Sequence, residues 1–229
     1  MKKARSCVAM IQSLPERISF AEFVEWYPDN GRRYELHNGI VIEMQPTSSH
    51  ELIAGFLAEE LTLAIRNAKL PYTIPRTCLL KPHLPDSGYQ PDVVVLNRTV
   101  LIDEPLWEKA SMIQYGKTVP LVIEVVSTNW QDDYAHKLVE YEAMAIPEYW
   151  IVEDTALDGS PDLKQVSVDF RALGAVRYIG KPKQPTITVC QLVEGEYQMQ
   201  RFIFGQRLDS SIFPELDLTT DTIFQAAEM

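Results

Sequence analysis

The sequence predicts a layered α/β domain in which helices flank a mixed central sheet. Over residues 50–152 the predicted elements follow the order helix, strand, strand, strand, helix, strand, an order that buries a sheet between helices. Two of the strands, DVVVL at 92–96 and LVIEVV at 121–126, are nearly continuous apolar runs, as expected for strands covered on both faces. Beyond residue 153 apolar and polar residues alternate, which predicts a β-rich C-terminal extension.

The N-terminal part of the chain contains signals for a short helix and a hairpin. SFAE at 19–22 has the pattern of a capping box, so a helix is expected from there through Trp26. YELHNGIVIEM at 34–44 has alternating apolar positions on either side of Asn38-Gly39, the pair favoured in tight hairpin turns. We therefore expect two antiparallel strands before the central domain.

A longer helix is predicted within residues 46–71. Ser48 or Ser49 is the expected N-cap, and the helix should have about four or five turns. Its broad apolar face consists of Ile53, Phe56, Leu57, Leu61, Leu63 and Ile65.

Short apolar runs predict the remaining strands of the core. Strands are expected at 77–83, 92–96, 121–126 and 148–152. The segment 97–118 is long and mixed, which favours a flap or a short helix, and a helix is expected from about 130 to 145. Further strands are expected at 166–170, 176–179, 186–193 and 196–204.

The sequence contains no repeat, no low-complexity segment and no clear linker, which favours a single domain. We predict one domain over residues 1–229, with a core at about 20–155 and the β-rich extension at about 160–229.

The composition is that of a globular protein. Hydrophobic residues make up 46% and charged residues 23% of the chain, and no apolar run approaches the ~20 residues that a membrane span needs. The three cysteines are widely spaced and form no CxxC pair, which argues against a disulfide framework or a zinc site. These features predict a cytoplasmic protein that does not associate with membranes.

The net charge of −11 argues against a protein that coats nucleic acid through many basic residues. It does not exclude a nuclease, because bound metal ions offset a local cluster of acidic groups. The sequence has no P-loop, no GxGxxG and no G-x-S-x-G elbow, so nucleotide-driven and serine-hydrolase chemistry have no support.

Two carboxylates are the first candidate site residues. Glu124 interrupts the apolar run 121–126, where a buried carboxylate is costly unless it is paired or binds a metal. Asp92 follows Pro91 and opens the preceding strand, so the two acids should lie close together if consecutive strands are neighbours. Such a pair suits Mg²⁺ or Mn²⁺. A structural ion pair for Glu124 and a turn role for Asp92 are the alternatives.

A helix motif supplies a third candidate. Asp133, Lys137 and Tyr141 stand four residues apart on the predicted helix 130–145. An Asp and a Lys at this spacing form an ordinary helix pair, worth ~0.2–0.5 kcal/mol. Lys137 also lies at the border of the buried face, where its long stem can reach over the sheet.

Taken together, these motifs resemble those of the Uma-type endonucleases, a branch of the PD-(D/E)XK, restriction-endonuclease-like superfamily. The similarity rests on PDVVVL, LVIEVVS, D-x3-K-x3-Y and IPEYWIVE, with YELHNG and the helix opened by His50 upstream. It covers roughly residues 20–155, and the order and spacing of the motifs are more specific than any one of them.

The resemblance implies a restriction-endonuclease-like core and a role for each matching residue. Asp92 and Glu124 correspond to the metal-binding acids, and Lys137 to a catalytic lysine that has moved from the strand to the next helix. In most of the superfamily the lysine lies two residues after the acid, where this chain has Val126. The resemblance further implies that Glu35 is an additional acidic residue of the catalytic site and that Asp133 and Tyr141 support Lys137. His50, at a helix start, could support the site by contacting a phosphate or water, and capping or packing is the alternative. Ala145 and Glu153 depart from the family pattern without touching these ligands.

The chemistry expected from this site is hydrolysis of DNA phosphodiester bonds. Mg²⁺ or Mn²⁺ on Asp92 and Glu124 would activate water and act as a Lewis acid. Lys137, which keeps its proton beside two carboxylates, would stabilise developing charge, and Glu35 could complete the metal shell or hold a ligated water. A homodimer is expected because paired sites cut both strands most simply.

Two other functions fit parts of the sequence. The acidic composition favours a catalytically inactive nuclease-fold protein that binds nucleic acid or a protein partner. A two-carboxylate glycosidase is the third option, although the lysine and the lack of a sugar-stacking aromatic pattern argue against it.

Overall fold

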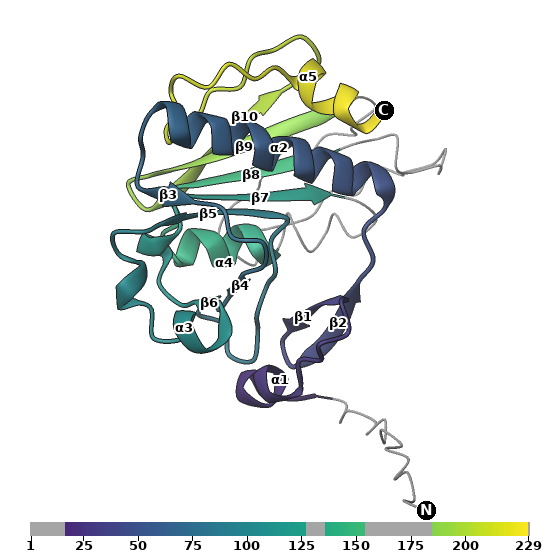
Figure 1. The fold of residues 1–229 in the computed structure, drawn as a ribbon, viewed down its shortest axis with the longest axis vertical. Helices are drawn as coiled ribbons and strands as arrows, with labels where there is room; N and C mark the ends of the chain where they lie inside the picture. Colours follow the sequence, from purple (N-terminus) through teal and green to yellow (C-terminus); the bar gives the residue numbers. More distant parts are fainter. Residues whose placement is uncertain (1–16, 127–135, 154–184, 229) are drawn as a thin grey trace, which may run out of the picture.

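The computed structural model describes residues 17–126, 136–153 and 185–228. A six-stranded mixed sheet lies at the centre, in the order β10-β9-β8-β7-β5-β3 (Figure 1). Only β7 and β8 are parallel, and the other neighbours are antiparallel. The strands are β3 (Tyr72–Thr73), β5 (Val93–Asn97), β7 (Leu121–Val126), β8 (Glu148–Glu153), β9 (Thr186–Val193) and β10 (Glu196–Phe202).

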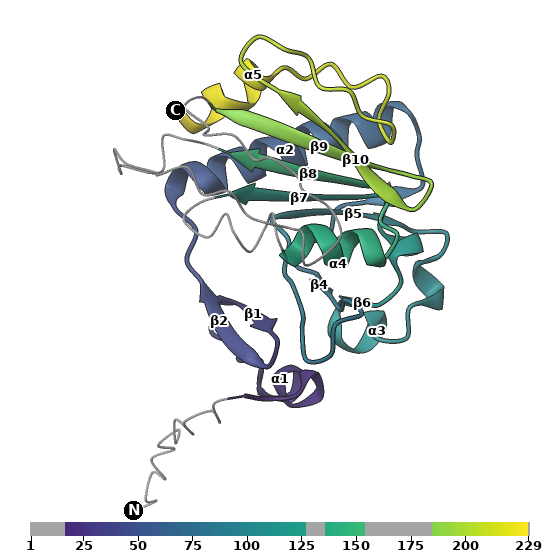
Figure 2. The same ribbon diagram turned by 180° about the vertical axis from the view of Figure 1, so that it is seen from behind.

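Helices cover both faces of this sheet. α2 (Ser48–Asn67) lies in front of it in Figure 1, and α4 (Leu138–Ala143) lies in front of it when the molecule is turned around (Figure 2). In β5, Val93 and Val95 pack into the cluster that contains the buried residues of α2, whereas Val94 packs into the cluster that contains α4. Leu63, expected on the apolar face of α2, is exposed instead. Successive strand residues point to opposite faces, so a continuous apolar run is what a sheet buried on both sides requires.

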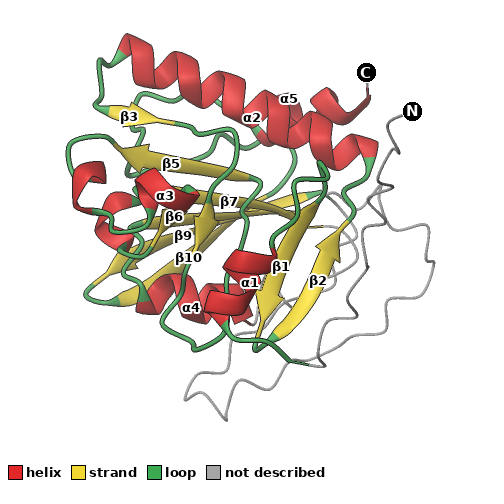
Figure 3. Ribbon diagram, turned by 60° about the horizontal axis from the view of Figure 1, so that its bottom comes forward, coloured by secondary structure: helices red, strands yellow, loops and turns green. Residues whose placement is uncertain are grey.

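The N-terminal elements form a separate layer beside the sheet. α1 (Phe20–Trp26) begins at a capping box between Ser19 and Glu22, as predicted. β1 (Arg33–His37) and β2 (Ile40–Met44) form the predicted hairpin (Figure 3), with Asn38 at φ 50° and Gly39 at φ 85° in its turn.

The hairpin is held against the rest of the protein through β1. Leu36 and Gly88 exchange two backbone hydrogen bonds of 2.9 and 2.8 Å. One face of the hairpin packs on α1 through Tyr34, Leu36 and Val41, which belong to a third apolar cluster. The opposite face therefore points away from that cluster, toward the position of the candidate site.

The connections and the C-terminal part complete the described chain. β4 (Leu79–Leu80) and β6 (Met112–Ile113) form a small parallel pair, and α5 (Thr220–Gln225) packs against α2. The remaining short elements are η1 (Leu101–Asp103), α3 (Trp107–Ala110), η2 (Gly116–Thr118) and η6 (Ala226–Glu228). No helix in these described ranges is long and apolar enough to cross a membrane.

Several sequence-based boundaries were wrong. The predicted strand 77–83 contributes only Leu79–Leu80, outside the central sheet, and the unpredicted strand Tyr72–Thr73 forms the sheet edge instead. Thr47, and not Ser48 or Ser49, is the N-cap of α2, because its side chain accepts the His50 N–H. The C-terminal hairpin β9–β10 continues the central sheet beside β8. The predicted strands at 166–170 and 176–179 lie outside the described residues.

Candidate active site

Asp92 and Glu124 meet where β5 and β7 pair. The antiparallel register joins Val93 to Ile123, so Asp92 lies one step further along, opposite Glu124. The backbone N–H of Val125 donates to Asp92 Oδ2 at 2.8 Å, which fixes the aspartate against β7. The strand pairing thus brings together two acids that are 32 residues apart in the sequence.

Lys137 lies between two buried carboxylates. Its Nζ is 3.1 Å from Glu35 Oε1 and 3.0 Å from Glu124 Oε1, and its side chain is 1% exposed. The lysine immediately precedes α4, and Tyr141, one turn further on, donates its hydroxyl to Glu124 Oε1 at 2.8 Å. Burial and the charge of Glu124 raise the pKa of Tyr141 well above its ordinary value, so Tyr141 stays a donor.

Glu35 is held on both of its oxygens. Oε1 accepts from Lys137 and from the backbone N–H of Gln90 at 2.8 Å, and Oε2 lies 2.7 Å from His37 Nε2. Burial acts to raise the pKa of Glu35, but the charge of Lys137 and the interaction with His37 outweigh it and lower the pKa below its ordinary value. Glu35 is therefore an ionised anchor for Lys137.

Asp92 contacts two basic side chains. Arg33 lies 3.3 Å from Oδ1, and His50 Nε2, at the start of α2, lies 3.1 Å from Oδ2. Burial acts to lower the pKa of His50, but its hydrogen bond to Asp92 and the charge of that carboxylate outweigh this effect and raise the pKa. The other ring nitrogen, Nδ1, is buried and has no hydrogen-bond partner.

The structure brings together most of the side chains that the sequence singled out. Glu35, Asp92, Glu124, Lys137, Tyr141 and His50 come from the hairpin, the two central strands and the two covering helices. Asp133 lies outside the described residues.

Sequence reasoning missed the side chains that hold the acids. It assigned no role in the site to Arg33, His37 or Gln90. A signal was present for two of them, because Arg33 and His37 stand two residues either side of Glu35, on the same face of a strand.

The fit of a metal ion can be judged from the donor set. The described residues contain no group of three or more His, Cys, Asp and Glu side chains that could enclose a metal. Mg²⁺ commonly uses only one or two carboxylates and keeps several waters, so the paired acids Asp92 and Glu124 suit it. Because Asp92 already faces Arg33 and His50, a divalent ion would have to displace a positive charge from that carboxylate.

The mixed sheet with helices on both faces places the protein in the restriction-endonuclease-like class of α/β folds. A family model described as "Putative restriction endonuclease" (Uma2) matches residues 20–221, and the chain belongs to that family. This confirms the resemblance seen in the sequence motifs.

The fold is also similar to a solved structure. A "putative nuclease" from Anabaena variabilis ATCC 29413 aligns with a TM-score of 0.63 and 15% identity, over 92% of this chain and 99% of that chain. At this identity the likeness concerns the fold alone. A comparison with curated proteins gave no match. The family supports a nuclease function.

Proposed function

We propose that the protein is a metal-dependent endonuclease that hydrolyses DNA phosphodiester bonds. The observation that carries the proposal is the buried chain of Glu35, Lys137 and Glu124 beside Asp92. Buried ion pairs add little to stability, so a cluster of this kind is more easily explained by chemistry than by folding.

In this proposal Asp92 and Glu124 hold Mg²⁺ or Mn²⁺. The bound ion would supply a Lewis acid and lower the pKa of a ligated water. The protein's own contribution is to fix the two carboxylates in place, through the Val125 N–H for Asp92 and the Tyr141 hydroxyl for Glu124. Preorganised ligands of this kind need no rearrangement when charge develops.

Lys137 acts electrostatically in the same proposal. Its ammonium group lies within hydrogen-bond distance of Glu124, where it can orient the attacking water or stabilise charge on the phosphate. Glu35 is a positioning residue, because both of its oxygens are already used to hold Lys137, Gln90 and His37. This assignment replaces the expectation that Glu35 completes the metal shell.

A second candidate function is a catalytically inactive nuclease-fold protein that binds nucleic acid or a protein partner. Two observations favour it: Lys137 is only 1% exposed, and Asp92 is already paired with Arg33 and His50. Metal binding separates the two candidates, because the inactive protein has no need of it.

The test is calorimetric titration of Mn²⁺ into the wild-type protein, Asp92→Ala and Glu124→Ala, with Asp103→Ala as control. Asp103 forms an exposed ion pair with Lys117, so its loss removes a carboxylate without touching the site. We expect binding in the wild type and control and none in the two site variants. Absence of binding in the wild type would contradict the proposal and favour the inactive protein.

Cleavage and assembly complete the test. Wild-type protein should cut DNA only when Mg²⁺ or Mn²⁺ is present, and light scattering would check the expected homodimer. The cytoplasmic location stays a prediction from the sequence.

A further inference from the structure

The hairpin carries three apolar side chains on the face that bears the site residues. In its register Met44 stands opposite Arg33, Ile42 opposite Glu35 and Ile40 opposite His37. Directly opposed residues of an antiparallel pair lie on the same face, with Cβ atoms about 5 Å apart. Met44, Ile42 and Ile40 therefore form an apolar stripe along this face.

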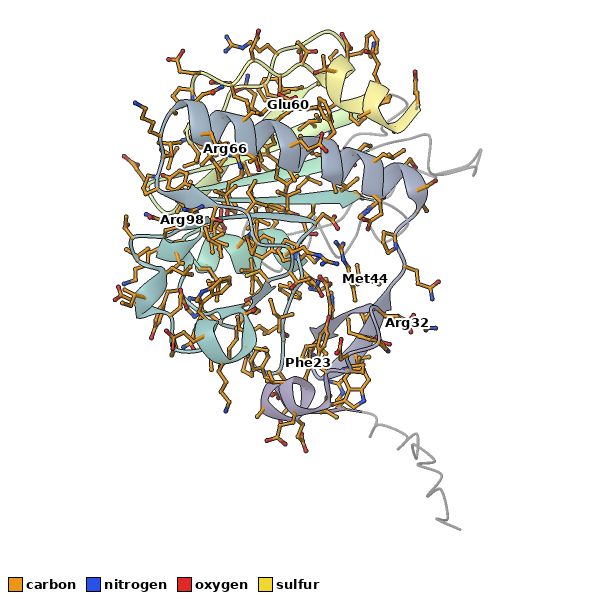
Figure 4. All side chains as sticks on the ribbon, viewed as in Figure 1. Phe23, Arg32, Met44, Glu60, Arg66 and Arg98 are labelled. Atoms are coloured by element: carbon orange, nitrogen blue, oxygen red, sulfur yellow. The ribbon has the colours of Figure 1, made fainter. Side chains whose placement is uncertain are left out.

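The apolar stripe is not part of the core. None of the three apolar clusters in the described chain includes its members, whereas Val41, which points the other way, packs against α1. Ile40 is 46% exposed, and Ile42 and Met44 are partly exposed. Figure 4 shows Met44 between the hairpin and the beginning of α2, while Arg32 extends away from the molecule.

The apolar stripe is continuous with the candidate site. Arg33, opposite Met44, bonds to Asp92, and Glu35, opposite Ile42, bonds to Lys137. In the proposed function a phosphate is attacked beside Asp92, and the strand that carries it would extend along the hairpin face that bears Arg33 and the apolar stripe. Successive members of the stripe are about 7 Å apart, which is close to the spacing of nucleotides in an extended strand.

Apolar side chains recognise the faces of bases and not phosphates. Ile and Met are among the apolar side chains that minor-groove proteins insert between base steps, where they partly unstack the bases. The bases of an intact duplex are stacked on one another and present only their edges. A phosphate-tracking surface would instead carry Lys or Arg at such positions.

We propose that the apolar stripe Ile40–Ile42–Met44 binds unstacked bases beside the phosphate that is cut, so that the substrate is single-stranded or locally opened DNA. This inference rests on the proposed function for its ligand, a DNA strand, and adds the substrate class.

The test is fluorescence anisotropy with a short labelled DNA strand and with the same strand in a duplex. All proteins are full-length and carry Asp92→Asn, so that the DNA stays intact. Ile42→Ser and Met44→Ser are the test variants. Ile40→Ser is a third stripe variant; because Ile40 is the most exposed of the three, its replacement should disturb folding least. Leu63→Ser, at a 52% exposed position near the far end of α2, is the matched control.

We expect the parent protein to bind the single strand about tenfold more tightly than the duplex, and each stripe variant to lose about fivefold in single-strand affinity. Duplex affinity and the Leu63→Ser control should not change. Unchanged single-strand affinity in the stripe variants would overturn the inference. So would a shift from dimer to monomer in those variants, since the stripe would then be an interface between copies.

The two proposals can fail separately. If the wild type cuts duplex DNA with Mg²⁺ or Mn²⁺ and the stripe variants cut it equally well, this inference is overturned and the nuclease proposal stands. Stripe-dependent binding of the single strand, with no cleavage by the wild type in Mg²⁺ or Mn²⁺, would overturn the catalytic proposal alone. A protein that binds neither form of DNA would overturn both.

Discussion

Lys137 is the residue on which the site's electrostatics depend. It lies 3.1 Å from Glu35 and 3.0 Å from Glu124, and all three side chains are buried. Removing one partner from such a pair leaves an uncompensated charge, at a cost of about 3–5 kcal/mol. Stability and activity therefore have to be measured together for any change at this position.

Lys137→Met removes the charge and keeps most of the side-chain volume. Under the proposed function we expect activity to fall about 10²–10⁴-fold, the range for a positioned catalytic group. The unfolding free energy should also drop, because Glu35 and Glu124 lose their shared cation. Cleavage rates and urea titrations on the same preparation measure both effects.

The double variant Glu35→Gln/Lys137→Met separates the two roles. Neutralising Glu35 along with Lys137 should recover part of the lost stability, since contacting residues are commonly coupled by about 0.5–3 kcal/mol. Activity should not recover, because the ammonium group is still missing. Recovery of activity with stability would mean that Lys137 is structural only.

The lowered pKa of Glu35 also predicts how the free energy of unfolding depends on pH. Its pKa is lowered below its ordinary value of 4.5, against the effect of burial, by Lys137 and His37. A carboxylate with a depressed folded-state pKa contributes stability above its unfolded pKa and loses it as the pH falls. The stability difference between wild type and Glu35→Gln should thus shrink as the pH falls below about 4.5. A difference that persists in acid, measured by urea titration, would contradict the ion pair.

Most residues of the candidate site could be predicted from the sequence, but some of the groups that hold them could not. Glu124 stands out because a carboxylate inside an apolar strand needs a partner, and Asp92 follows from the adjacency of consecutive strands. Gln90 is an ordinary residue in its local sequence. Its role, donating its backbone N–H to Glu35, arises where two distant segments meet, and no local pattern encodes that meeting.

At the scale of elements, the site depends on the position of α4 relative to its neighbouring elements. Gly116, at the start of η2, lies so close to the end of α4 that a Cβ there would meet the carbonyl oxygen of Met144 at 1.9 Å. Met144 caps the helix that begins directly after Lys137. Any side chain at residue 116 must therefore shift the backbone of one element or the other.

Gly116→Ala is expected to destabilise the protein by about 2–4 kcal/mol, because overpacking against backbone cannot be relieved by a side-chain rotation. Gly55→Ala is the matched control. Gly55 is a helical glycine of α2 with open space around its Cβ position, so the same change should stabilise by up to about 1 kcal/mol. Thermal unfolding of the two variants measures the contrast, and equal effects would contradict the close approach.

Element prediction succeeded where the signal is local and failed where it is not. The Asn38-Gly39 turn and the apolar run 121–126 predict their elements well, since turn chemistry and burial act within a few residues. Tyr72–Thr73 was missed because two residues have no periodicity. The run around Leu79–Leu80 is apolar because it is buried, yet it pairs outside the sheet, and apolarity alone does not specify a pairing partner.

At the scale of the whole molecule, the sheet joins the site strands to the C-terminal part of the chain. Every residue of β8 pairs with β9, and Glu148, at the start of β8, makes a second connection. Its buried carboxylate accepts hydrogen bonds from Trp150 Nε1 at 2.7 Å, from Ser210 Oγ at 2.6 Å and from the Ser211 N–H at 2.7 Å. One side chain thus links the central sheet to the segment that leads to α5.

Glu148→Ala tests whether the C-terminal part unfolds with the core. The change leaves the buried donors Trp150 and Ser210 without their acceptor, so we expect a loss of about 2–4 kcal/mol. If residues 1–229 form one domain, as the sequence predicts, hydrogen exchange should accelerate together in β7, β8, β9 and α5. Glu215→Ala, an exposed acid in the same segment, is the control and should change neither stability nor exchange. Faster exchange confined to β9, β10 and α5 would contradict the single-domain prediction, because those elements would then open while the site strands stay folded.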